Sequence, residues 1–329
     1  MRMPRLATRS VRLLAVPLLL AGLAAGVAPV TAAAARAGSP GLVASFTISG
    51  RLNGVAATSA RSAWAVGFTG SNLSPHTLIV RWNGKLWKRV PSPSPAGSVL
   101  SGVAATSAGS AWAVGSTGSG KTLILRWNGT TWKRVPSPSP GAGAGLSGVA
   151  ATSAGSAWAV GFTGSKALIL RWNGTAWKRV PSPSPAFSER FFRGVAAVSA
   201  RRAWAVGCST CATASGFNKP LIERWNGTAW KAVPSPSRTG GILSGVAATS
   251  ARSAWAVGGT ERGVGSGTRI RTLILRWNGT TWKRVPSPSP GLRAGLSGVA
   301  ATSARNAWAV GSTGSGKTLI LRWNGTAWK

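Results

Sequence analysis

Two segments have the residue types and spacing of a phosphate-binding loop. Residues 115–122 and 311–318 both read GSTGSGKT, which fits G-x-x-x-x-G-K-[ST]. In that motif backbone amides surround phosphates, the Lys contacts them and the Thr holds magnesium. A helix must follow the loop, because its N-terminus supplies the anion site. Here KTLILRWNG follows, which is typical of a strand, and no Asp exists as a second magnesium ligand. We therefore interpret both segments as Gly/Ser hairpin loops and reject nucleotide hydrolysis.

Few other residues could do chemistry. Cys208 and Cys211 form a C-x-x-C pair outside any βαβ pattern, and zinc would need two more ligands where the only histidine is His76. We expect a local disulfide instead. A two-carboxylate glycosidase needs paired acids, which the repeats described below do not supply. The acidic residues are Glu189, Glu223 and Glu261. The sequence predicts no catalytic residue, no metal site and no cofactor.

The charge balance points to polyanions. The 329 residues are 44% hydrophobic, enough for a buried core, yet they hold 39 Lys and Arg against 3 acidic residues, a formal net charge of +36. Such an excess attracts teichoic acid, acidic polysaccharide, extracellular DNA or anionic lipid. The alternative is a solvated basic surface with only non-specific attraction.

The N-terminus predicts export. Residues 1–37 combine four early arginines, an apolar run from Leu13 to about Val30 and small residues suited to cleavage, as in a secretory signal peptide. An uncleaved membrane anchor is the alternative. Cleavage would remove five Arg and leave a net charge of +31. We expect a secreted, extracellular or wall-associated monomer with no later membrane span.

The rest of the chain is repetitive. Six units begin near residues 52, 100, 146, 192, 243 and 296, at spacings of 46–53 residues measured on their shared GVAA, and each holds three of the 18 Trp. In the second unit the expected strands cover 101–107, 111–115, 122–128 and 130–135, with an Asn-Gly hairpin turn before the last. In AWAVG, Trp112 and Val114 face one side and Ala111 and Ala113 the other. The fold prediction is an all-β, six-bladed β-propeller over 51–329, with four antiparallel strands per blade.

The repeat resembles the Trp-rich tandem repeats, AWAVG followed by WNGTxW, of secreted bacterial β-propeller proteins. The resemblance covers about residues 50–329 and implies fold and export more than activity. The last unit stops at Lys329 without the RVPSPSP that ends four of the other five units. Within the N-terminal segment 38–50, we expect residues 41–49 to pair with the last sheet and close the ring. An open array is the alternative.

Two surfaces are candidate binding sites. The first is a basic girdle on the outer strands, formed by Lys88, Arg89, Lys133, Arg134, Lys178, Arg179, Lys283 and Arg284. An Arg also precedes the second Trp of every unit. The second surface is the face that carries the variable 2–3 loops and the connections between blades, since variable loops on a rigid scaffold often bind ligands. Its aromatic and basic candidates are Phe187, Arg190, Phe191, Phe192, Arg193, Phe217, Lys219, Arg262, Arg269 and Arg271.

The sequence therefore predicts a binding protein and no enzyme, with an anionic cell-wall polymer, polysaccharide or extracellular DNA as its partner. The alternatives are a degenerate carbohydrate-active enzyme that uses the loop-bearing face and a scaffold for protein–protein interaction. Drift in functionless loops would also account for the variable segments.

Overall fold

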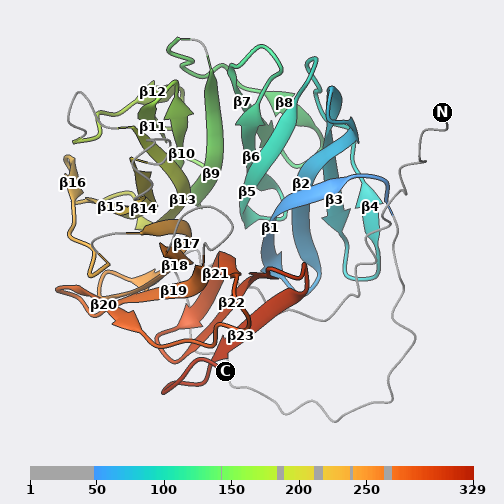
Figure 1. Ribbon diagram of the computed structural model, residues 1–329. Coiled ribbons are helices and arrows are strands. Elements are labelled where there is room, and N and C mark those ends of the chain that lie inside the picture. The colour runs from blue at the N-terminus through green and yellow to red at the C-terminus, as the bar shows by residue number, and fades with distance from the viewer. Residues whose placement is uncertain (1–47, 142, 184–188, 211–217, 238–239, 263–268) are drawn as a thin grey trace, which may run out of the picture.

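The computed structural model describes residues 48–329 except 142, 184–188, 211–217, 238–239 and 263–268. The expected signal peptide and most of the N-terminal segment lie outside the described residues. The described chain is all-β and forms the predicted six-bladed β-propeller, with the blades arranged in chain order around one axis (Figure 1).

Each blade is an antiparallel meander. Blade 1 is β1 (Arg51–Ser59), β2 (Ser62–Ser71), β3 (Ser74–Trp82) and β4 (Trp87–Arg89). Blade 2 is β5 (Val99–Ser107), β6 (Ser110–Ser116), β7 (Thr122–Trp127) and β8 (Trp132–Arg134). Blade 3 is β9 (Ala144–Ser153), β10 (Ser156–Thr163), β11 (Lys166–Trp172) and β12 (Trp177–Arg179). Blade 4 is β13 (Arg190–Ser199), β14 (Arg202–Ser209), β15 (Lys219–Trp225) and β16 (Trp230–Ala232).

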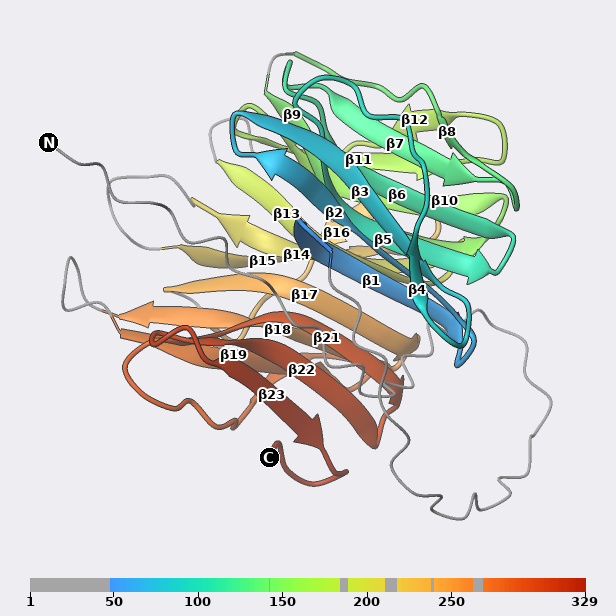
Figure 2. The ribbon, with the colours of Figure 1, turned by 90° about the vertical axis from the view of Figure 1, so that its right-hand side faces the viewer.

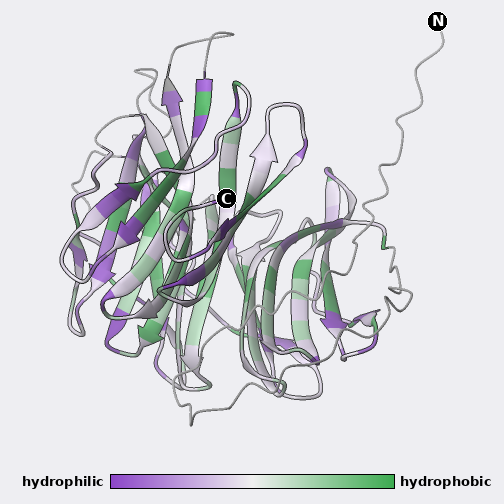
Figure 3. Ribbon diagram, turned by 90° about the horizontal axis from the view of Figure 1, so that it is seen from below, coloured by the Kyte–Doolittle hydropathy of each residue, from purple (hydrophilic) through white to green (hydrophobic). Residues whose placement is uncertain are grey.

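Blade 5 is β17 (Gly241–Ser250), β18 (Ser253–Arg262), β19 (Arg269–Trp277) and β20 (Trp282–Val285). Blade 6 is β21 (Ala294–Ser303), β22 (Asn306–Thr313) and β23 (Thr318–Trp323). In place of a fourth strand, blade 6 has one bridge between Trp323 and Trp328. The strands of each blade lie side by side (Figure 2). Both hydrophobic and hydrophilic residues occur along the strands (Figure 3).

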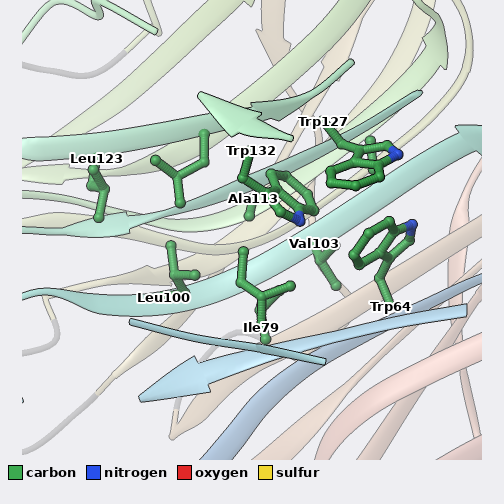
Figure 4. Packing of buried hydrophobic residues seen from close by; sticks show 11 residues of the cluster. Trp64, Ile79, Leu100, Val103, Ala113, Leu123, Trp127 and Trp132 are labelled. Atoms are coloured by element: carbon green, nitrogen blue, oxygen red, sulfur yellow. The ribbon is translucent and has the colours of Figure 1, made fainter. Parts of the chain in front are cut away.

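The blades pack through the two faces that the alternation predicts. Trp112 and Val114 belong to the core shared with blade 3, whereas Ala111 and Ala113 belong to the core shared with blade 1. Bulky side chains of one blade thus meet small ones of the next, an arrangement that suits the close packing of protein interiors. In the core between blades 1 and 2, the Trp64 ring lies 4.9 Å from Trp127 and 5.1 Å from Trp132, centroid to centroid (Figure 4).

The turn between the third and fourth strands differs from the prediction. In blade 2, Trp127 pairs with Trp132, so the loop has four residues instead of two. Only Gly129 takes a positive φ, of 103°. The Asn128 side chain closes the loop, because its Oδ1 accepts hydrogen bonds from the amides of Thr130 and Thr131 and from the Thr130 hydroxyl. Such bonds from an Asn side chain to the following backbone form an Asx turn, which mimics a backbone turn.

The two end blades do not cover each other. Each innermost strand contacts that of the next blade from β1 through to β21, but within the described residues no comparable contact joins β21 to β1. On the outward face of blade 6, Val310 is 42% and Ile320 is 55% exposed. Their counterparts in blade 2, Val114 and Ile124, are fully buried. Among the described residues, the ring is therefore open on this face.

The start of the described chain lies against blade 1. Ile48 packs on Ala65, Leu78 and Val80, and the Thr69 hydroxyl donates a hydrogen bond to the carbonyl of Ser49. Residues 41–47, which hold most of the expected closing strand, lie outside the described residues, so its pairing with the last sheet stays a prediction.

Candidate anion-binding surfaces

The GSTGSGKT segment of blade 2 is a closed hairpin loop. The amide of Thr117 donates to the carbonyl of Lys121, and the amide of Gly120 donates to the carbonyl of Thr117. Strand β7 follows directly, so no helix N-terminus is present to bind a phosphate. The hydroxyl of Thr122 bonds to Ser137 and to the carbonyl of Pro138 in the linker that follows the blade. The interpretation as a Gly/Ser hairpin loop agrees with these contacts.

The 2–3 loops and the linkers between blades lie on one face, as the meander topology predicts. The amide of Gly118 in a 2–3 loop donates to the carbonyl of Ala96 in the preceding linker. The amide of Arg190, which opens blade 4, donates to the carbonyl of Ser165 in the 2–3 loop of blade 3. These bonds define the loop-bearing face of the ring.

The structure brings together only some of the ten aromatic and basic residues that the sequence predicts on the loop-bearing face. Phe187 and Phe217 lie outside the described residues, as does the side chain of Arg262. Phe192 is fully buried in the core between blades 3 and 4, where other blades carry Leu, so it has no surface to offer a ligand. Phe191 is half-buried, with its ring 5.5 Å from that of Phe162. Arg193, Lys219, Arg269 and Arg271 are exposed.

Arg190 is engaged by an acid. Its Nη1 lies 3.8 Å from Oε1 of Glu223, and its side chain is only 14% exposed. Glu223 is fully buried in β15, and its Oε1 also accepts a hydrogen bond of 2.8 Å from the Ser182 hydroxyl. Burial raises the pKa of Glu223 to about 7, against the opposing effects of the Ser182 hydrogen bond and the Arg190 charge. Arg190 therefore has a structural partner.

The three glutamates have separate surroundings. Glu261 in β18 accepts a hydrogen bond of 2.9 Å from the Asn218 amide, and the carbonyl of Glu189 accepts one from the amide of Thr210. Among the described residues, the side chains of Glu223 and Glu261 thus accept their hydrogen bonds from Ser182 and Asn218, which lie far apart in the chain. Among the described residues, no group of three or more His, Cys, Asp or Glu could hold a metal ion. Cys208 is disulfide-bonded, and the chain's other cysteine, Cys211, lies outside the described residues.

The basic girdle is exposed. Its eight residues belong to the outermost strands β4, β8, β12 and β20, and all eight are exposed: Lys88, Arg89, Lys133, Arg134, Lys178, Arg179, Lys283 and Arg284. Like charges on an exposed outer strand also discourage edge-to-edge pairing with another sheet. The protein thus has two sets of exposed basic residues. One is the basic girdle, which forms the outer rim of the ring, and the other lies on the loop-bearing face.

The arginines before the second Trp are structural, which the sequence analysis missed. The Arg81 guanidinium lies 5.1 Å from the Trp64 ring of its own blade and 5.5 Å from the Trp127 ring of the next. Its Nη2 donates to the carbonyl of Ala108. Arg126, Arg171, Arg224 and Arg276 repeat the two ring contacts, whereas Arg322 of the last blade has only Trp308. Cation–π contacts between blades hold these cations.

Only two members, Lys219 and Arg271, of one further set of basic residues were named in the sequence analysis. The residue at the start of the third strand, next to the 2–3 loop, is basic and exposed in each blade. These loop-face basic residues are His76, Lys121, Lys166, Lys219, Arg271 and Lys317. Aligning the six units on the Leu-Ile that all of them share in this strand would have revealed the column, because the residue two positions before that Leu is His, Lys or Arg in every unit.

Comparisons with known proteins give the fold class. No protein-family model and no curated protein matches the chain. Among solved structures, YCF48 bound to a D1 peptide is 17% identical over 85% of this chain and 80% of its own, with a TM-score of 0.53. The GH74 xyloglucanase from Xanthomonas campestris is 15% identical over 85% of this chain, with a TM-score of 0.57, and U3-55K is 10% identical over 83% of this chain and 77% of its own, with a TM-score of 0.54.

This chain spans 45% of the xyloglucanase. At these identities the similarity shows the propeller fold alone. No helix within the described part of the chain is long and apolar enough to cross a membrane.

Proposed function

We propose that this protein is an exported binding protein that holds anionic extracellular or cell-wall polymers on its basic surface and catalyses no reaction. The observation that carries the proposal is the exposure of Lys-Arg pairs at one equivalent position on four outer strands. The chain has 39 basic residues and only three glutamates, so most of this charge has no carboxylate to neutralise it.

Electrostatics favours a long anionic ligand over a small one. Each exposed cation that neutralises a phosphate or carboxylate releases condensed counterions, and this gain increases with the number of contacts. The one fully buried glutamate, Glu223, already interacts with Arg190, and Glu261 bonds to a neutral amide. No residue of the basic girdle forms an ion pair among the described residues, so the girdle can contact a polymer.

Binding at increasing salt tests the proposal. The protein from residue 38 onward would be mixed with peptidoglycan that retains or lacks teichoic acid, with neutral polysaccharides and with DNA. We expect every polyanion to bind and log affinity to fall linearly with log salt concentration, whereas the neutral polysaccharides stay unbound. A neutral glycan that binds at physiological salt and is displaced by free sugar would contradict the proposal.

The structural similarity to a xyloglucanase makes a carbohydrate-active enzyme the second candidate. Its acids would have to come from Glu189, Glu223 and Glu261, and Glu223 is fully buried. Hydrolysis of any polysaccharide that the triple Glu→Gln variant abolishes would support the enzyme and overturn a purely binding role. The similarity to YCF48 bound to a peptide suggests peptide binding instead, which uncharged peptides in the same panel would detect.

A further inference from the structure

The loop-face basic residues form a circle around the axis of the ring. In four blades the residue pairs with one on the second strand, as in Thr69 with His76 and Thr163 with Lys166. In blades 2 and 6 it ends the 2–3 loop, where the Lys121 amide bonds to the hydroxyl of Thr117 and the Lys317 amide to that of Thr313. Because the blades follow one another around the axis, the circle has one basic side chain per blade.

No carboxylate neutralises this circle. None of the loop-face basic residues forms an ion pair within the described part of the chain. The fold does not require a cation here either, because the side chains are exposed and the residue type changes between His, Lys and Arg while its basic character stays. Lys, the commonest of the three, acts toward phosphate as a flexible point charge.

The size of the circle restricts the ligand. Neighbouring strands in a sheet lie about 4.8 Å apart, so the third strand stands roughly 10 Å outside the innermost one. The circle is then at least ~20 Å across, with roughly 10 Å or more between successive basic residues. A small anion can contact only one of them. A DNA duplex, which stays straight over about 50 nm, would cross the face as a chord and meet two or three. A flexible chain can follow the circle and contact all of them.

We propose that the loop-bearing face holds one flexible, linear, phosphate-bearing polyanion that runs around the ring axis and contacts the loop-face basic residues of successive blades. The inference rests on the proposed function, since it names the face and the kind of polymer for the same basic surface. The half-buried Phe191, with its ring against Phe162, offers no free aromatic platform, so a polymer without bases fits as well as a nucleic acid.

Two matched variants test the inference. The loop-face variant changes Lys121, Lys166, Lys219, Arg271 and Lys317 to Gln. The rim variant changes four lysines of the basic girdle and the exposed lysine at the equivalent position of blade 4 to Gln: Lys88, Lys133, Lys178, Lys283 and Lys231. Both remove five exposed charges at one equivalent position of the repeat. The probe is long-chain inorganic polyphosphate, titrated at several salt concentrations, with duplex DNA as the stiff comparison. A third variant exchanges Lys and Arg at the loop-face positions and keeps the charge.

The expected change follows from counterion release. For a flexible polyanion, log affinity falls with log salt concentration by about 0.7 for each phosphate contact. Loss of five contacts should therefore make this dependence shallower by about 3.5 in the loop-face variant. If affinity extrapolated to 1 M salt is unchanged, this means a loss of the order of 10³-fold for polyphosphate at 0.15 M salt. The charge-keeping exchange should restore binding, and the rim variant should lose far less.

The outcomes separate the two proposals. Equal losses in the loop-face and rim variants would overturn the inference and leave the proposed function intact, because the whole surface would then bind without preference. A duplex DNA slope that falls as far as the polyphosphate slope would exclude the flexible chain as the preferred ligand. If the unaltered protein binds no polyanion, the proposed function itself fails.

Discussion

The buried carboxyl group of Glu223 makes the stability of this propeller depend on pH. Four of the other blades carry Leu at this position, as Leu125 in blade 2. The side chain is fully buried, and its Oε2 has no hydrogen-bond partner. Burial raises the pKa from 4.5 to about 7. The folded state therefore binds the proton more tightly than the unfolded state, and this stabilisation is complete below pH 4.5 and is lost as the pH rises through about 7.

The expected size follows from the pKa values. A difference between 4.5 and about 7 corresponds to about 3 kcal/mol of unfolding free energy. Glu223→Leu removes this titration, so its stability relative to the unaltered protein should be about 3 kcal/mol higher at pH 8.5 than at pH 4.5. Urea unfolding followed by Trp fluorescence at both pH values measures this.

A control separates charge from shape. Glu223→Gln keeps the size of the side chain and can still accept the Ser182 hydrogen bond, but it cannot ionise. It should lose the same part of the pH dependence as Glu223→Leu. If both variants keep the pH dependence of the unaltered protein, Glu223 does not titrate between these pH values, and the reasoning from its burial is refuted.

The repeats supply matched pairs for two further predictions. Ile124→Ala should cost about 3–4 kcal/mol, as for a fully buried side chain, whereas Ile320→Ala on the uncovered face of blade 6 should cost about 1 kcal/mol. Equal costs in urea unfolding would mean that another part of the protein covers blade 6. Gly115→Ala should cost about 3 kcal/mol, because its Cβ would overlap the carbonyl oxygen of Val99. Gly109→Ala should be nearly neutral, because no atom lies within 3.5 Å of its Cβ, and a comparable fall in melting temperature for both would contradict this.

The features that could be predicted from the sequence are those that depend on residues within one repeat. The strands of blade 2 and the two faces of AWAVG follow from alternation over a few residues, and Trp112 and Ala113 lie in the predicted cores. The Asn128 loop was misjudged because the dipeptide Asn-Gly favours a two-residue turn, whereas the cross-strand pairing of Trp127 with Trp132 fixes a longer one.

Features that arise between repeats were missed. The stacking of Arg81 on Trp127 joins two blades, so no pattern within one unit indicates it. Whether blade 6 contacts blade 1 depends on the angles between consecutive blades, added over the five interfaces of the ring. No sequence pattern within one unit specifies that sum. The burial of Glu223 is a similar case, because the hydroxyl of Ser182 reaches it from the linker that follows blade 3.

The six units also allow packing and ligand binding to be distinguished within one chain. Where every unit has the same residue, as with the Trp of AWAVG and the Arg before the second Trp, an interface between blades accounts for it. At the start of the third strand, the side chains are exposed and change between His, Lys and Arg. A position that only packs would keep the size and shape of its side chain across the six units, while its charge could change. At the start of the third strand the opposite holds, because the basic character is kept and the shape of the side chain changes. A constraint on charge alone is what an anionic partner imposes, and this difference leads us to the loop-bearing face as the binding surface.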